Sequence, residues 1–321
     1  MTSSRSKAVG QMRGAKGSAY EGGHRVPFFL SWPKGGIGGG RDVDTLTAHI
    51  DVLPTMIELC GLKRPAGPEM HGRSLKPLLE GKKTAWPQRT LVVDSQRLEK
   101  LVKWRQCAVM TEEWRLVNPS PDGDPARLEL YAIRKDPGQQ NDVAAQNTAV
   151  VERLKAGYEK WWKLVSARGD EYVRISLGSP AENPVTLTGH DWHSNDAEKV
   201  WNQGQIRRGP AANGHWAVDV KRAGAYRFEL RRWPREVGLP INAPYRDKEP
   251  NRETTPGEAV EVVKARIRMA GVERETKVAP QEAAAVFEMK LAAGPAELQT
   301  WFSSSKGTER GAYYVYVTYL G

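Results

Sequence analysis

The sequence is organised around the stretch Lys16-Gly17-Ser18-Ala19-Tyr20-Glu21-Gly22-Gly23-His24-Arg25-Val26-Pro27. It joins a lysine and a pair of glycines to a basic turn, and an apolar run follows it directly. Glycine lets a backbone turn sharply or approach another segment closely, so the stretch predicts a tight turn. The apolar residues Val26, Phe28, Phe29, Leu30 and Trp32, interrupted by Pro27 and ended by Pro33, predict a buried strand at 26–32 after that turn.

Composition limits the class of protein. The chain has 321 residues, of which 39% are hydrophobic and 27% charged, as expected of a globular protein of about two domains. Its formal net charge of +10 favours an anionic partner, such as nucleic acid, acidic polysaccharide, a membrane surface or a sulfate or phosphate ester. Lysine and arginine never occur four in a row, which argues against a nucleic-acid-binding tail.

The sequence contains no signal that assigns a compartment. No apolar stretch reaches membrane-spanning length, so no membrane is expected as a partner. Residues 1–16 are polar and lack the apolar core of a secretory signal. The two cysteines allow one disulfide at most. Cys60 closes an amphipathic pattern and is expected to be a buried thiol, and neither Cys60 nor Cys107 stands at metal-ligand spacing from another Cys or His.

The first half alternates between short strand and helix patterns. Asp51 is expected to cap a helix whose apolar face includes Leu53, Met56 and Cys60. Strands are expected at 91–94, 107–111, 114–117 and 128–133, and a longer helix at 148–168. These patterns predict a small antiparallel sheet with a C-terminal helix, within a domain of residues 1–169.

The second half changes character. Apolar and charged residues alternate in five segments that turn signals separate, and these segments are 226–233, 260–269, 285–291, 296–302 and 313–319. Several short strands with no helix between them predict an all-β sandwich, of jelly-roll type, over residues 170–321.

The first half resembles the C-terminal part of arylsulfatases of the alkaline-phosphatase-like superfamily. The opening stretch carries this resemblance, and further matching groups follow it in the same order. These groups are Trp32-Pro33, His49-Ile50-Asp51-Val52-Leu53-Pro54-Thr55, Leu59-Cys60-Gly61, Gly72-Arg73-Ser74-Leu75, Leu130-Tyr131 and Asp136-Pro137-Gly138. The resemblance spans about residues 10–165 and implies an α/β remnant, the C-terminal part of a sulfatase domain. The second half resembles, more loosely, the extra β domain of some bacterial sulfatases.

The resemblance implies a reaction and its chemistry. Sulfatases hydrolyse sulfate esters with a formylglycine nucleophile and a divalent cation, usually calcium, while Lys and His side chains compensate charge on the sulfate. Their substrates include sulfated polysaccharides, and intact members are often periplasmic or secreted. In this sequence the resemblance assigns Lys16 as a sulfate contact, with Gly17, Gly22 and Gly23 turning the backbone near it. The simpler alternative is that Lys16 is an ordinary exposed loop lysine.

Two parts of the sulfatase pattern are missing from the sequence. The motif Cys/Ser-x-Pro-x-Arg, which yields formylglycine, does not occur. The Asp-Asn metal pair should shortly precede Lys16, but residues 1–41 contain a single acidic side chain, Glu21. The sequence therefore predicts a truncated arylsulfatase-like chain that holds neither cofactor and is inactive alone. A sheet without most of its strands is also expected to expose apolar surface.

Several other groups leave alternatives open. His190, Asp191, His193 and Asp196 form either a metal site or, more simply, a polar loop. Glu21 beside Arg25 predicts a structural ion pair rather than a general base.

Aromatic and basic residues of the second half suggest a different class of function. Trp192, Trp201, Trp216 and Trp233 form either a sugar-stacking platform or part of a core. The pairs Arg207-Arg208 and Arg231-Arg232 either recognise sulfate groups or lie on solvated strand faces. The alternative function is thus a non-catalytic β-sandwich that binds sulfated carbohydrate or packs on a catalytic domain.

Overall fold

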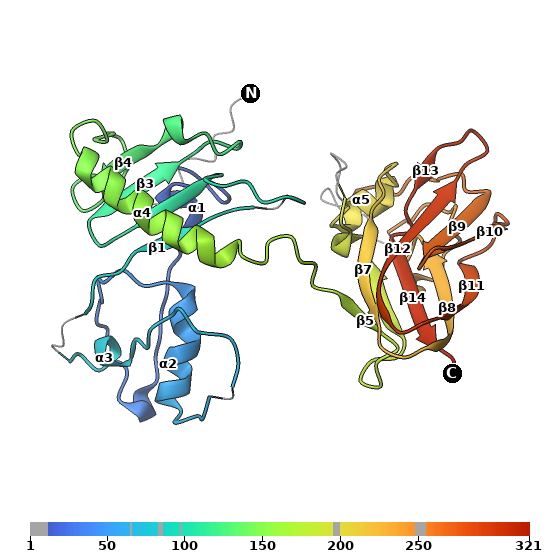
Figure 1. The fold of residues 1–321 in the computed structure, drawn as a ribbon, viewed down its shortest axis with the longest axis horizontal. Coiled ribbons are helices and arrows are strands. Elements are labelled where there is room, and N and C mark those ends of the chain that lie inside the picture. Colours follow the sequence, from blue (N-terminus) through green and yellow to red (C-terminus); the bar gives the residue numbers. More distant parts are fainter. Residues whose placement is uncertain (1–11, 65, 83–85, 97, 195–199, 248–254) are drawn as a thin grey trace. The chain divides into compact units, whose positions relative to one another are not determined.

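The computed structural model describes residues 12–64, 66–82, 86–96, 98–194, 200–247 and 255–321. The chain divides into two compact units, Met1–Asp170 and Glu171–Gly321 (Figure 1). Each unit has hydrophobic cores of its own. The fold is mixed and rich in sheet with few helices, which confirms the coarse expectation from the sequence. In the described part, no helix combines the length and apolar character needed to cross a membrane.

The first unit is built on a four-stranded antiparallel sheet in the order β1-β2-β3-β4. The strands are β1 (Leu91–Val93), β2 (Cys107–Met110), β3 (Trp114–Asn118) and β4 (Glu129–Ala132). All four lie where the sequence pattern predicted them. Every residue of β2 is buried, because both faces of the sheet are covered.

Two different segments cover the two faces of this sheet. The predicted helix is present as α4 (Thr148–Val165), which lies across one face of the sheet (Figure 1). Its Leu154 and Tyr158 join the core on that face. The ring of Tyr158 stacks on Trp104 with centroids 3.7 Å apart. On the other face, Ala19 and Tyr20 of the opening stretch pack against residues of β2, β3 and β4. The opening stretch is therefore part of the core of this unit.

The remaining helices of the chain are short. The α-helices are α1 (Glu21–His24), α2 (Val52–Leu59), α3 (Lys76–Leu79) and α5 (Gln203–Arg208). The 3-10 turns are η2 (Pro33–Gly35), η3 (His49–Asp51), η4 (Pro125–Arg127), η5 (Gly189–Asp191) and η6 (Arg235–Val237). Helix α2 begins directly after Asp51, as predicted, but the Asp51 side chain makes no capping bond to it, because other groups engage this carboxylate.

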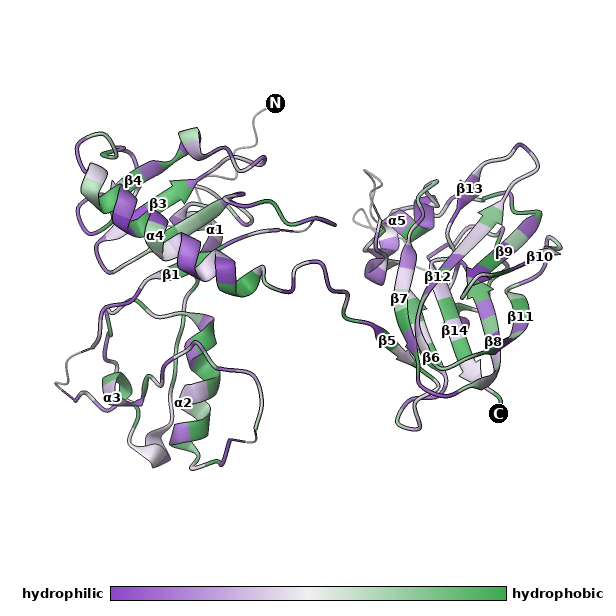
Figure 2. Cartoon of the chain, in the orientation of Figure 1, coloured by the Kyte–Doolittle hydropathy of each residue, from purple (hydrophilic) through white to green (hydrophobic). Residues whose placement is uncertain are grey.

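The expected buried strand at 26–32 is wrong. Within the described residues, the run from Val26 to Ser31 pairs with no strand, and Val26 and Phe29 are 75% and 91% exposed. Its apolar composition predicted burial, but burial requires a covering layer that the described part does not provide. Likewise, Leu53 on α2 is 60% exposed and Cys60 is exposed rather than buried, and Figure 2 shows the hydrophobic residues of α2.

The second unit contains two sheets. One has the order β10-β9-β12-β7-β5, with β13 also paired to β12, and the other has the order β11-β8-β14-β6. The strands are β5 (Ile175–Leu177), β6 (Val185–Thr188), β7 (His215–Val220), β8 (Gly224–Arg231), β9 (Lys264–Met269), β10 (Val272–Lys277), β11 (Ala285–Leu291), β12 (Gly294–Ser303), β13 (Glu309–Arg310) and β14 (Tyr314–Tyr319). All pairs are antiparallel except β5 with β7.

One hydrophobic core joins the two sheets of this unit. Trp216 of β7 and Ile267 of β9 meet Phe228 of β8 and Phe287 of β11 in that core. Burial alternates along β11 residue by residue, as the apolar and charged alternation predicts. The presence of α5 makes the expectation of strands alone too narrow.

Candidate functional site

Lys16 stands at the corner of a tight turn. The Ser18 amide donates to the Ala15 carbonyl at 2.9 Å, which closes a four-residue turn. Gly17 occupies the third position with φ of +92°, a conformation that favours glycine. The Lys16 side chain is exposed, and among the described residues it has no hydrogen-bond or ion-pair partner. The turn thus presents a free ammonium group.

The glycine pair lets two backbone segments meet behind this turn. The Gly22 amide donates to the Arg13 carbonyl at 2.9 Å. A Cβ on Gly23 would lie 2.1 Å from the Ser18 carbonyl oxygen, and one on Gly22 would lie 2.6 Å from the Gly14 oxygen. Both glycines belong to α1, so they allow close approach rather than the sharp turn that the sequence suggested.

Gly23→Ala should therefore destabilise the first unit, whereas Gly38→Ala should not. Overpacking costs typically about 1–3 kcal/mol, and here the obstructing Ser18 oxygen is backbone, which relaxes poorly. Gly38 has open space around its would-be Cβ and serves as the control. Scanning calorimetry of both variants checks this. Equal stability of the two variants would contradict the close approach of Gly23 to the Ser18 carbonyl oxygen.

Below the turn lies a buried ion pair. Glu21 is 2% exposed, and Arg115 Nε on β3 donates to its Oε1 at 2.6 Å. The pair with Arg25 that the sequence predicted is present but longer, at 3.7 Å, and Arg25 is exposed. The Glu21 amide also donates to Gln139 Oε1 at 2.8 Å. Glu21 is thus a structural residue whose main partner, Arg115, is 94 positions away.

Arg13 and two tyrosines complete the base of the turn. The Arg13 guanidinium lies over the Tyr20 ring, 3.9 Å from its centre, and donates to Tyr131 Oη at 2.7 Å. Both tyrosine hydroxyls donate to Glu129 Oε2, at 2.8 and 2.6 Å. Burial and the Glu129 carboxylate raise the pKa of Tyr20 to about 12, so its hydroxyl remains a neutral donor. This network joins the opening stretch to β4.

Of the four groups considered as metal ligands, the three that the structure describes, His190, Asp191 and His193, do not gather as a cation site. His190 is exposed, and Asp191 accepts a hydrogen bond from Thr188 Oγ1 at 2.8 Å. His193 lies beside His215, and Asp196 lies outside the described residues. Across the ranges that the structure describes, no three His, Cys, Asp or Glu side chains gather as a cation site.

The described residues also do not fit the cofactors of a sulfatase. The Glu21 carboxylate, the acid nearest in sequence to Lys16, is engaged by Arg115 and is not available to calcium. Cys107 is buried in β2, where burial raises the pKa of its thiol to about 12. Such a thiol is inert, and Cys60 is exposed on another segment. The segment 2–7, where the metal pair was sought, lies outside the described residues.

The tryptophans mostly belong to cores. Trp216 and Trp233 are buried, and Trp192 packs against the same cores, whereas Trp201 is exposed. They therefore do not form one exposed stacking platform.

The sequence pairs Arg207-Arg208 and Arg231-Arg232 differ in their ion-pair partners and in their burial. Arg207 pairs with Asp247, and Arg231 lies near Glu229. The expected solvated position is wrong for Arg232, which is 1% exposed.

Comparison with known proteins identifies relatives of the first unit. Residues 15–163 match the family model described as "N-sulphoglucosamine sulphohydrolase, C-terminal". Human steryl-sulfatase is 42% identical over 73 residues, which cover 23% of this chain and 12% of that protein. An N-acetylgalactosamine-6-O-sulfatase of Bacteroides thetaiotaomicron is 29% identical over 159 residues, which cover 46% of this chain and 29% of that protein.

A solved structure is also similar to part of the chain. It is described as a complex with the substrate D-glucosamine-2-N,6-O-disulfate, is 24% identical, and covers 38% of this chain and 25% of that one, with a TM-score of 0.28. The chain therefore spans less than a third of the length of each of these proteins.

Proposed function

We propose that this chain, whose residues 15–163 form the C-terminal region of a sulfatase, contributes one wall of a site that hydrolyses sulfate esters. Lys16 contacts the sulfate group in this proposal. The observation that carries it is the turn at 15–18, which presents an unpaired ammonium group on a buried base of ion pairs and hydrogen bonds.

The chemistry of the ester explains why a lysine serves here. An alcohol leaving a sulfate ester needs positive charge near the sulfate oxygens, where negative charge is concentrated in the transition state. An ammonium on a long stem is a compact point charge that reaches such oxygens. The Arg13–Glu129 network holds the turn in place, so that Lys16 needs little reorganisation to act.

The chain alone is proposed not to hydrolyse sulfate esters. Formylglycine and calcium, when bound, would supply the nucleophile and the charge that polarises the sulfate, but the described residues offer neither a Cys/Ser-x-Pro-x-Arg motif nor a calcium ligand set. In this proposal, the groups that attack the ester lie on a further protein part that packs against the first unit. The exposed Val26, Phe28 and Phe29 support this, because such apolar segments usually pack against protein.

The substrate class is proposed to be sulfated carbohydrate. The bacterial relative is named for a sulfated N-acetylgalactosamine, and the positive net charge of this chain suits an anionic polysaccharide. We also propose that residues 1–169 and 170–321 are separate domains, the second being a β-sandwich accessory domain. The separate cores of the two units and the shared core of the two sheets support this.

Lys16→Ala tests the assignment in an active setting. A chimera is made in which residues 15–163 of this chain replace the matching segment of the Bacteroides N-acetylgalactosamine-6-O-sulfatase. Hydrolysis of the sulfated sugar that this enzyme acts on is then measured with and without the substitution. Losing a charge that acts on the transition state should lower kcat at least about tenfold, or about 1.4 kcal/mol. Lys34→Ala, at an exposed lysine in the 3-10 turn η2, should leave kcat unchanged.

Two results would count against the proposal. An active chimera in which Lys16→Ala and Lys34→Ala behave alike would remove Lys16 from the site. Turnover of an aryl sulfate with calcium by the purified chain itself would show that it carries its own nucleophile.

A further inference from the structure

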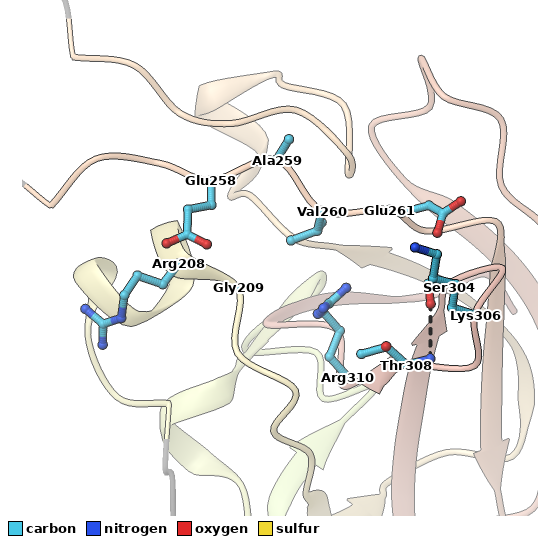
Figure 3. A pocket seen from close by; sticks show the side chains of 10 residues that line it. All are labelled: Arg208, Gly209, Glu258, Ala259, Val260, Glu261, Ser304, Lys306, Thr308 and Arg310. Atoms are coloured by element: carbon cyan, nitrogen blue, oxygen red, sulfur yellow. Dashed lines mark hydrogen bonds between the residues drawn. The ribbon is translucent and has the colours of Figure 1, made fainter.

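The second unit contains a polar cavity of about 260 Å³ (Figure 3). It lies where the end of α5 meets the segment 258–261 and the turn that leads into β13. The charged side chains that line it are Arg208, Glu258, Glu261, Lys306 and Arg310. None of the functions proposed for the first unit uses this cavity.

Arg310 is the central feature of the cavity. It lies on β13 and is only 9% exposed, and Figure 3 shows its guanidinium pointing toward Val260. Its Nε and Nη1 are buried and have no hydrogen-bond partner among the residues that the structure describes. Arginine stays protonated in proteins, and a buried charge without a counterion is costly. An anion beside Arg310 would supply both the counter-charge and the hydrogen-bond acceptors that its buried Nε and Nη1 need.

A second buried guanidinium increases this positive charge. Arg232 is 1% exposed, and its Nη2 donates to the carbonyls of Arg207 at 2.9 Å and Glu258 at 2.8 Å. These carbonyl groups accept hydrogen bonds from Nη2 without neutralising the charge of Arg232, and its Nε has no hydrogen-bond partner among the described residues. Burial lowers the pKa of Arg232 to about 10, and the charge of Arg310 acts in the same direction, whereas Tyr313 and Glu258 act in the opposite direction. The two cations thus lie close enough to repel each other.

The carboxylates at the cavity do not cancel this charge. Glu261 accepts hydrogen bonds from Ser305 Oγ at 2.8 and 2.9 Å, and Glu258 is exposed. In the described part of the chain, neither forms an ion pair with Arg310. Lys306 adds a further positive charge on the turn closed by the Ser304 amide and the Thr308 carbonyl. Lys306, Arg310 and the adjacent Arg232 thus outnumber the two carboxylates at the cavity, Glu258 and Glu261.

We infer that this cavity binds an oxyanion, the sulfate, phosphate or carboxylate group of a small acidic ligand, and that Arg310 is its main donor. A guanidinium presents parallel N–H groups that match two oxygens of such an anion. The volume lies slightly below the range of about 300–1,000 Å³ that is usual for drug-sized ligands, so a small ligand fits. Gly209 keeps the wall open, because a Cβ there would lie 2.6 Å from Val260 Cγ1.

The test uses the full chain and three probes at constant ionic strength: sodium sulfate, sodium phosphate and sodium acetate. Titration calorimetry measures affinity, and scanning calorimetry measures the rise in the unfolding temperature of the second unit, since a ligand that binds only the folded state stabilises it. Arg310→Met should weaken binding of the preferred anion at least tenfold. Arg310→Lys, which keeps the charge but loses the parallel N–H donors of the guanidinium, should retain part of the affinity.

The matched control is Arg274→Met on the exposed strand β10, which changes net charge equally and should leave binding unchanged. Without added anion, Arg310→Met should be at least as stable as the wild type, because it removes an unpaired buried charge. A preference for acetate identifies a carboxylate, and a preference for sulfate or phosphate a tetrahedral anion. Absence of binding, or equal binding by the Arg310→Met and Arg274→Met chains, would overturn the inference.

Discussion

Replacement of Asp51 by alanine is expected to destabilise the first unit by about 3–5 kcal/mol, the range for breaking a buried ion pair from one side. Asp51 is fully buried, and its Oδ1 accepts hydrogen bonds from Arg89 Nη1 at 2.7 Å and the Arg73 amide at 2.8 Å. Its Oδ2 accepts from the Ala48 amide at 2.8 Å. Alanine would leave the guanidinium of Arg89 buried without its counterion and two amides without an acceptor.

Calorimetric unfolding of the first unit measures this loss. The matched control is Asp44→Ala, because Asp44 also pairs with an arginine, Arg134, but its side chain is 83% exposed. Water already solvates that pair and screens it, so the control should lose far less stability. Similar losses in both variants would show that the Asp51–Arg89 pair does not carry the stability assigned to it.

The stability of Asp51→Ala should also depend on pH differently from the stability of the wild type. Burial on its own raises the pKa of Asp51, but hydrogen bonds from Arg89, Arg73 and Ala48 outweigh it and hold this pKa below its ordinary value. Because the folded pKa is the lower one, the stabilisation is complete above the unfolded value of about 4 and disappears as pH falls through the folded value. The difference in stability between the wild type and Asp51→Ala should therefore shrink below about pH 4.

Asp51 also shows which features of the structure the sequence could predict and which it could not. Local rules placed a helix start directly after it, and the structure confirms that start. They assigned its carboxylate to helix capping, whereas the carboxylate instead binds Arg89, 38 positions away. A partner at that distance leaves no trace in a local pattern. Helix α4 and strands β1 to β4 were predicted correctly because their apolar periodicity is itself local.

Burial was the property that composition predicted least well. The apolar residues at 26–32 indicated a buried strand, but whether such a run is covered depends on a second layer. The converse error concerned Arg232, whose alternating context indicated a solvated face although the structure buries it. Strand β10 was missed because its residues are mostly polar and lie exposed at a sheet edge.

The candidate site could be predicted only in part. Lys16 and its glycines were proposed through a resemblance, and the role of Lys16 stays a prediction, whereas the structure shows why a glycine suits positions 17, 22 and 23. The supporting contacts of Arg13 with Tyr131 and of Glu21 with Arg115 join residues more than 90 positions apart, so no motif could reveal them. Arg310 offered no signal at all, since nothing in its local sequence distinguishes a buried arginine from a surface one.

Glu21→Ala is expected to have a comparably large effect, about 3–5 kcal/mol, because it leaves Arg115 with a buried and unpaired charge. Arg115 would keep its hydrogen bonds to the carbonyls of Thr111 and Trp114, but these do not neutralise it. Glu159→Ala, which breaks a pair with Lys103 in which both side chains are substantially exposed, is the control and should lose far less. Calorimetric unfolding of the two variants gives the comparison.

The position of the pair gives this variant a second consequence. Glu21 joins α1 to β3, and α1 supports the backbone behind the Lys16 turn through Gly22 and Gly23. In the chimeric sulfatase, Glu21→Ala should therefore lower kcat even at temperatures where the protein remains folded, because Lys16 loses its fixed position. If stability falls while kcat stays at the wild-type value, the ion pair supports only the fold, and Lys16 is positioned by the Arg13 network alone.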